Sequence, residues 1–98
     1  MTNRQKLLNY IKNGGDEFIC VFVGQTKEEI TGYMEELQAQ IMEMGLEHAQ
    51  NEPYGIVTVS QGATVRVPQK HEEFEKFVYE ADIKLYQCKE KGRNAIVI

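Results

Sequence analysis

Two consecutive glycines near the start of the chain constrain its fold more than any other feature. Gly14 and Gly15 lie in the segment 13–16, an Asn-Gly-Gly-Asp sequence that favours a tight turn. Directly after it, residues 18–23 carry no charged side chain. A short apolar run of this kind is typical of a strand that is covered on both faces of its sheet. With the mixed segment 8–12 as the first arm, the sequence predicts a hairpin with two glycines and two carboxylates at its tip.

The residues after the apolar run predict a long helix. Thr26 and Glu29 have the spacing of a capping box, in which each side chain accepts the backbone N–H of the other residue. Gly45 suits the left-handed residue that ends many helices. Between them, apolar residues recur at helical spacing along one face, at Ile30, Tyr33, Met34, Leu37, Ile41 and Met44. We therefore expect a helix from Thr26 to Gly45 with one buried face.

The second half of the chain predicts a strand at 56–60, a helix at about 71–89 and a terminal strand at 95–98. The expected order is strand, strand, helix, strand, helix, strand. Strands joined by a tight turn run antiparallel, and helices between the others can cover the sheet. The sequence therefore predicts an α+β fold, an antiparallel sheet with helices packed on it. The aromatic and leucine residues Phe18, Phe22, Tyr33, Phe74, Phe77 and Leu85 are expected in its core.

Composition narrows the class of protein. The chain of 98 residues has room for one small domain. Its formal net charge of -4 argues against a nucleic acid or an anionic membrane as partner, because those need clustered Lys and Arg. No apolar run approaches the ~20 residues of a membrane span. Cys20 and Cys88 are far apart and form no metal-binding motif, which predicts two buried thiols in a reducing compartment and hence a cytoplasmic protein.

Four short motifs follow one another along the chain. They are Gly14-Gly15-Asp16-Glu17-Phe18, the segment VTVSQG at 57–62, the segment ADIKLYQCK at 81–89, and Gly92-Arg93-Asn94. Their order and spacing resemble the GGDEF domain of diguanylate cyclases, the family that joins two GTP molecules into cyclic di-GMP. Cys88 stands where the family usually has alanine. The resemblance implies a ferredoxin-like, nucleotide-cyclase type of fold and a nucleotidyltransferase that acts in signalling.

The resemblance also implies roles for individual residues. Asp16 and Glu17 correspond to the catalytic and metal-binding acids, and carboxylate oxygens suit the expected Mg²⁺ or Mn²⁺. Gly14 and Gly15 correspond to nucleotide-binding positions, where a backbone without side chains can approach a ligand. Lys89 and Arg93, four residues apart at a helix end, correspond to contacts with the GTP phosphates. The simpler alternatives are a solvated turn for the signature and compensation of the helix dipole for the two cations.

One departure from the family limits the prediction of activity. The family carries a metal-binding aspartate on a strand before the signature, whereas no Asp or Glu occurs between Met1 and Gly15. Residues 1–98 are therefore interpreted as a partial GGDEF domain that lacks the N-terminal strand and helices. Two hypotheses remain open: a cyclase fragment that is inactive as an isolated chain, and a non-catalytic module that binds nucleotide or protein. The exposed sheet face expected of a partial domain predicts a homodimer.

Overall fold

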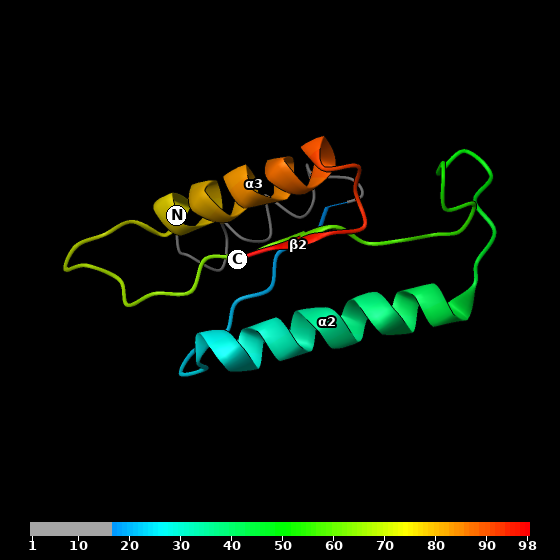
Figure 1. The fold of residues 1–98 in the computed structure, drawn as a ribbon. Helices are drawn as coiled ribbons and strands as arrows, with labels where there is room; N and C mark the ends of the chain where they lie inside the picture. Colours follow the sequence, from blue (N-terminus) through cyan, green and yellow to red (C-terminus); the bar gives the residue numbers. More distant parts are fainter. Residues whose placement is uncertain (1–16) are drawn as a thin grey trace.

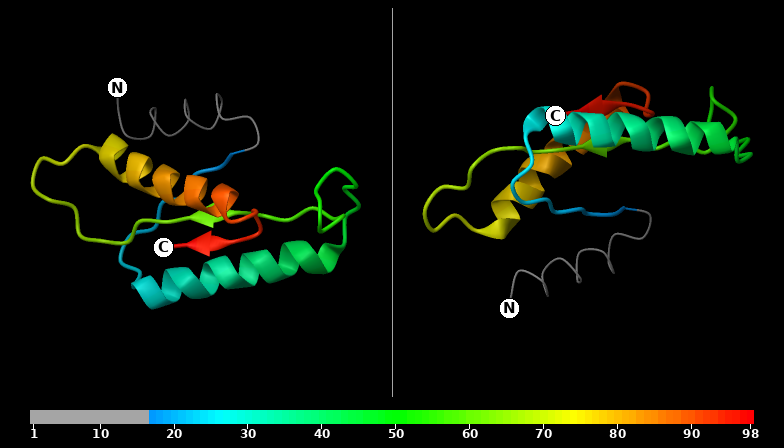
Figure 2. Two further views of the ribbon diagram at one scale, coloured as in Figure 1. Left: turned by 45° about the horizontal axis from the view of Figure 1, so that its top comes forward. Right: turned by 90° about the horizontal axis from the view of Figure 1, so that it is seen from below.

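The computed structural model describes residues 17–98, in the order α2 (Lys27–Met44), β1 (Gln61–Gly62), α3 (Phe74–Glu90) and β2 (Ile96–Val97). The glycine turn and the first arm of the predicted hairpin lie outside these residues. Figure 1 shows the two strands between the helices, with α3 on one side and α2 on the other. The turned views in Figure 2 agree with this arrangement. The described part of the chain is therefore a three-layer α+β structure with a narrow sheet.

The start and the end of α2 are confirmed. The N–H of Glu29 donates to Thr26 Oγ1 at 3.1 Å, and Glu29 Oε1 accepts the N–H of Thr26 at 3.2 Å. These bonds satisfy donors that the first helical turn leaves unpaired. At the other end, Gly45 has a φ of 58° and donates its N–H to the carbonyl of Met42 at 3.1 Å. The local sequence thus sets both boundaries of this helix.

The buried face of α2 is narrower than predicted. Ile30 and Met34 are buried, but Tyr33 is 45% exposed and Leu37 is 43% exposed. The helix is attached to the strand layer partly through polar contacts, because Gln61 donates from Nε2 to the carbonyl of Met34 at 2.8 Å. Placing Tyr33 in the core is therefore wrong for this structure.

The predicted antiparallel sheet is also wrong for the strands that the structure describes. β1 and β2 run parallel, with Gln61 opposite Ile96 and Gly62 opposite Val97. The reason is the connection between them: α3 carries the chain back along the length of the strand, so β2 starts at the same end as β1. Among residues 17–98, the single antiparallel contact is a bridge between Glu47 and Ile56. The predicted strand at 56–60 is thus displaced to 61–62.

The apolar run at 18–23 does not form a strand. A strand needs a neighbour for its backbone hydrogen bonds, and among residues 17–98 no strand pairs with this segment. Its side chains are correspondingly open, with Phe18 80% and Val23 87% exposed. Phe22 is 53% exposed and its ring lies 5.7 Å from the ring of Tyr33, centroid to centroid. The prediction that Phe18 and Phe22 belong to the core is therefore wrong.

The tightest packing lies between β1 and α3. A Cβ atom on Gly62 would lie 2.6 Å from the carbonyl oxygen of Ala81 and 2.8 Å from Cα of Leu85, so only glycine fits there. Cys88 is fully buried at this interface and its thiol donates to the carbonyl of Gln61 at 3.2 Å. Cys20, in contrast, is exposed, which corrects the prediction of two buried thiols. Small residues thus bring helix and strand into direct backbone contact.

The start of α3 differs from the prediction by one turn. His71 has a φ of 65°, and this left-handed backbone cannot belong to a right-handed helix. The helix begins instead at Phe74, after an extended Glu73 that makes no capping bond with its side chain. Phe74, Phe77 and Leu85, all predicted core residues, are half-buried.

Arg66 attaches the loop before α3 to the helix itself. Its guanidinium donates to both carboxylate oxygens of Glu80, at 3.0 and 3.1 Å, and to Glu72 at 2.8 Å. The same group lies 4.2 Å from the centre of the Phe77 ring, a distance suited to a cation–π contact. Across residues 17–98, neither helix is long and apolar enough to cross a membrane.

Candidate functional site

The C-terminal end of α3 carries the two predicted phosphate-binding cations. Gly92 has a φ of 96°, and its N–H donates to the carbonyl of Lys89 at 3.3 Å. The N–H of Arg93 donates to the carbonyl of Cys88 at 2.9 Å. These two bonds form a Schellman motif, which satisfies carbonyl groups at the helix end and turns the chain sharply away. The glycine therefore places Arg93 directly beyond the last turn of the helix.

The turn after α3 contains three successive left-handed residues. Arg93 has a φ of 66° and Asn94 a φ of 48°, following Gly92. This backbone is uncommon for residues other than glycine, although asparagine tolerates it better than most. Such a turn needs support from its surroundings.

Contacts from two other segments supply that support. Ser60 Oγ accepts the N–H of Asn94 at 3.1 Å. The Gln38 side chain donates from Nε2 to the carbonyl of Asn94 at 2.9 Å and to its Oδ1 at 3.1 Å. Ser60 belongs to the segment that leads into β1 and Gln38 to α2, so the strand layer and one of the two helices hold the turn. The position of Arg93 follows from these contacts.

An ion pair joins the signature to the end of α3. Lys89 Nζ lies 3.1 Å from Oε1 of Glu17, although the two residues are 72 positions apart in sequence. The side chains are 38% and 30% exposed. An ion pair this exposed to solvent contributes little to the free energy of unfolding. Its relevance is that it brings the two residues together. The structure thus brings together a predicted catalytic residue and a predicted nucleotide-binding residue.

Arg93 stays available at the same helix end. Its side chain is exposed, and none of the carboxylates in 17–98 forms an ion pair with it. An open guanidinium can bind a phosphate group through two parallel hydrogen bonds. Gly14, Gly15 and Asp16 lie outside the described residues, and their roles stay predictions.

The described residues do not form a magnesium site by themselves. Within 17–98, no three His, Cys, Asp or Glu side chains are grouped in a way that would hold a metal ion. Glu17 is the one signature carboxylate in this range, and Lys89 already binds it. Mg²⁺ prefers near-octahedral oxygen coordination, which a single paired carboxylate does not supply. No chemical step through a metal is therefore assigned to these residues.

Sequence reasoning missed the residues that hold the turn. Ser60 and Asn94 are both motif residues, and their shared presence was a signal that the two motifs meet in space. Gln38 had no such signal, because a polar residue on a helix is usually solvated. Through their contacts with the turn, these residues decide where Arg93 lies.

Lys89 and Arg93 thus lie at one helix end, and Lys89 contacts Glu17, the last acid of the glycine-rich signature. The family model described as "Diguanylate cyclase, GGDEF domain" matches residues 4–95. The chain therefore belongs to the GGDEF domain family of diguanylate cyclases, signalling enzymes that depend on a metal and use GTP. Neither the curated proteins nor the solved structures gave a match.

Proposed function

We propose that the C-terminal end of α3 binds the phosphate groups of GTP through Lys89 and Arg93. The observation that carries this proposal is the 3.1 Å ion pair between Lys89 and Glu17, because it sets the lysine beside the GGDEF signature. A bound phosphate group carries more negative charge than the carboxylate of Glu17, so it is the stronger partner for Lys89. Arg93, open and adjacent, adds a planar group that binds phosphate in bidentate fashion.

We further propose that the isolated chain binds GTP without converting it to cyclic di-GMP. Phosphoryl transfer depends on precise positioning and on neutralising the charge that develops. In these 98 residues the acids near the signature are Asp16 and Glu17, and no Asp or Glu occurs between Met1 and Gly15. A metal held by Asp16 and a carboxylate shared with Lys89 would be weakly fixed. Lost positioning of this kind lowers rates by several powers of ten.

A second function, that of a non-catalytic interaction module, is favoured by the apolar surface of the segment 18–23. Phe18, Val21, Phe22 and Val23 are each more than half exposed. Contiguous apolar side chains on a soluble protein usually mark an interaction surface. A second copy of the chain is the occupant that we propose, which makes the protein a homodimer.

Calorimetric titration with GTP in the presence of Mg²⁺ tests the nucleotide site. We expect Lys89→Met and Arg93→Ala each to weaken binding by roughly tenfold or more, the value of a charge-assisted hydrogen bond. Lys91→Met is the matched control, because Lys91 is an exposed lysine of the same helix end. Equal GTP affinity in all four proteins would exclude the proposed phosphate contacts.

Two further measurements test the proposed lack of cyclase activity and the proposed homodimer. Mass spectrometry of the reaction mixture should show no cyclic di-GMP from the isolated chain, and product that disappears in Asp16→Asn would contradict the proposed inactivity. Analytical ultracentrifugation should show a dimer that Phe22→Asp converts to a monomer. A folded monomer at micromolar concentration would exclude the dimer.

A further inference from the structure

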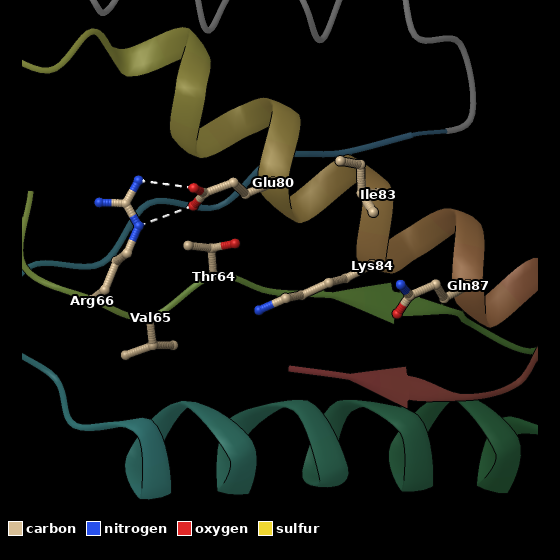
Figure 3. Close-up of a pocket in the computed structure, with 7 residues that line it drawn as sticks. All are labelled: Thr64, Val65, Arg66, Glu80, Ile83, Lys84 and Gln87. Atoms are coloured by element: carbon tan, nitrogen blue, oxygen red, sulfur yellow. Dashed lines mark hydrogen bonds and ion pairs between the residues drawn. The ribbon is translucent and has the colours of Figure 1, made fainter.

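A pocket on another side of α3 is separate from the proposed GTP site. It has a volume of about 380 Å³ and lies between the segment 64–66 and four residues of the helix, Glu80, Ile83, Lys84 and Gln87. Figure 3 shows these side chains around the opening. Lys84 precedes Lys89 by five residues, so at about 100° per residue the two side chains lie about 140° apart around the helix axis. The two lysines therefore serve different surfaces.

The pocket follows from the alternation of side chains after β1. Gly62 faces α3, and in an extended chain Thr64 and Arg66 face the same way. Figure 3 shows Thr64 and Arg66 on the α3 side, while Val65 points in the opposite direction. Gly62 lets the helix touch the strand, whereas the larger Thr64 and Arg66 keep the next part of the chain away from it. The pocket lies where helix α3 and the chain after Gly62 diverge.

The charges in the pocket are unequally compensated. The guanidinium of Arg66 donates to both oxygens of Glu80 and to Glu72, and Lys76 Nζ lies 3.5 Å from the other oxygen of Glu72, so these two cations and two carboxylates already compensate one another. Lys84 is half-buried, its side chain extends along the pocket in Figure 3, and it forms no ion pair with any carboxylate in 17–98. One positive charge is thus left for a ligand.

Below the surface of the pocket lies an unsatisfied hydroxyl group, so the polar contacts open to a ligand come from the rim. Thr64 Oγ1 is buried and has no hydrogen-bond partner in the part of the chain that the structure describes. Buried polar atoms are normally paired, and leaving one unpaired costs free energy. The Gln87 side chain at the rim offers an amide, and Ile83 offers an apolar wall. Together with Lys84, these groups suit a ligand that has an anionic end and an apolar flank.

We propose that this pocket binds a small organic anion through a carboxylate or phosphate group. Lys84 forms an ion pair with the anionic group, the Gln87 amide donates a hydrogen bond to it, and the rest of the ligand packs on Ile83. A cation is disfavoured because the pocket carboxylate, Glu80, is already bound on both oxygens by Arg66. A volume of about 380 Å³ lies at the small end of the usual range for ligand sites.

NMR titration of the full chain tests the proposal with three probes: benzoate, phenyl phosphate and benzylammonium. We expect saturable shifts of the backbone amides of residues 64, 83, 84 and 87 with at least one of the two anions. The comparison of benzoate with phenyl phosphate identifies which anionic group is preferred. Benzylammonium, a cation of similar size and shape, should give no saturable shift at these positions.

Substitutions then separate a binding role from a structural one. Lys84→Met keeps the length of the side chain and should weaken anion binding by about tenfold or more, with GTP affinity unchanged. Lys27→Met, at an exposed lysine of α2, is the matched control and should change neither affinity. Gln87→Leu removes the amide at similar size, and because Gln87 is exposed it should weaken anion binding without lowering the denaturant midpoint.

The proposal is wrong if neither anion gives a saturable shift at these four amides, or if the shifts occur only around Lys89 and Arg93. It is equally wrong if Lys84→Met binds the anion as tightly as the unchanged protein. Loss of GTP binding in Lys89→Met tests the function proposed above and leaves the anion result unaffected, so the two proposals fail separately.

Discussion

The hydroxyl of Ser60 accepts a 3.1 Å hydrogen bond from the backbone N–H of Asn94, 34 residues further along the chain. Both residues belong to motifs by which the GGDEF family is recognised. Their contact holds a left-handed turn, and Arg93 lies inside that turn. Part of what these motifs encode is therefore the shape of the helix end that presents the cation.

Replacing the serine should weaken both the fold and the nucleotide site. In Ser60→Ala the half-buried N–H of Asn94 loses its acceptor, which costs about 1–3 kcal/mol of unfolding free energy. Urea unfolding measures this loss, and GTP titration should show weaker binding because Arg93 is less well positioned. Ser60→Thr retains a hydroxyl and is the control. An unchanged urea midpoint in Ser60→Ala would mean that the contact does not hold the turn.

The contact between β1 and α3 predicts opposite effects for two glycine substitutions. Gly62→Ala places a Cβ 2.6 Å from the carbonyl oxygen of Ala81, and this overpacking should lower stability by about 1–3 kcal/mol or more. Gly32→Ala, in the middle of α2 with nothing within 4 Å of its Cβ, should raise stability by about 0.5–1 kcal/mol. Thermal or urea unfolding of both variants checks the prediction. Equal effects would contradict the direct backbone contact.

The Arg66 cluster predicts a dependence of stability on acid pH. Hydrogen bonding to Arg66 lowers the pKa of Glu72 below its ordinary value of 4.5, although burial of the carboxylate opposes this. A lowered pKa in the folded state means that the stabilisation is complete above the ordinary pKa. The stabilisation is lost as the pH falls through the lowered pKa of Glu72 in the folded protein. Glu72→Gln should therefore be less stable than the unchanged protein at pH 7, and the difference should shrink below pH 4.5.

Urea midpoints measured from pH 7 down to pH 3 check this dependence. Glu36→Gln, which removes an exposed carboxylate of α2, is the control and should show no comparable change with pH. A difference between Glu72→Gln and the unchanged protein that stays constant with pH would contradict the role of the Arg66 ion pair.

The two cysteines should differ in their reaction with thiol reagents. Cys20 is exposed, whereas Cys88 is fully buried and its thiol donates to the carbonyl of Gln61. A folded sample treated with a thiol-specific reagent should modify Cys20 rapidly and Cys88 only on unfolding. Peptide mass spectrometry with and without urea distinguishes the two. Rapid modification of Cys88 without urea would show that the interface of α3 with β1 opens readily.

The sequence predicted the helices better than the strands, for a physical reason. Helix boundaries depend on neighbouring residues, such as the capping pair Thr26 and Glu29, so a local sequence is enough to locate them. Strands depend on partners elsewhere in the chain. The run 18–23 has the composition of a buried strand, yet no strand within 17–98 pairs with it and most of its side chains are exposed. Pairing direction likewise follows from the connection through α3.

The candidate functional site and the pocket at Lys84 show the same division between what local sequence determines and what depends on distant parts of the chain. Lys89, Arg93 and Glu17 were identified from the motifs, and the structure adds that Lys89 and Glu17 form an ion pair, while their roles stay predictions. The pocket at Lys84 could not be predicted, because it depends on where the chain diverges from α3 after Gly62. The compensation of Arg66 by Glu80 and Glu72 was equally invisible in the sequence, since it joins residues on either side of an irregular loop.

The lack of any gap at Gly62 has a mechanical consequence. The helix cannot slide or roll on β1 without a collision between backbones, so α3 and β1 respond to force as one stiff lever. At 1.5 Å per residue, the 17 residues of α3 span about 25 Å. Lys89 lies four to eight residues, about 6–12 Å, beyond the contact at Ala81 and Leu85, so a tilt of about 10° around that contact would displace Lys89 by about 1–2 Å relative to Glu17 and strain their ion pair. A push on the start of this helix would therefore be transmitted to the ion pair at the signature.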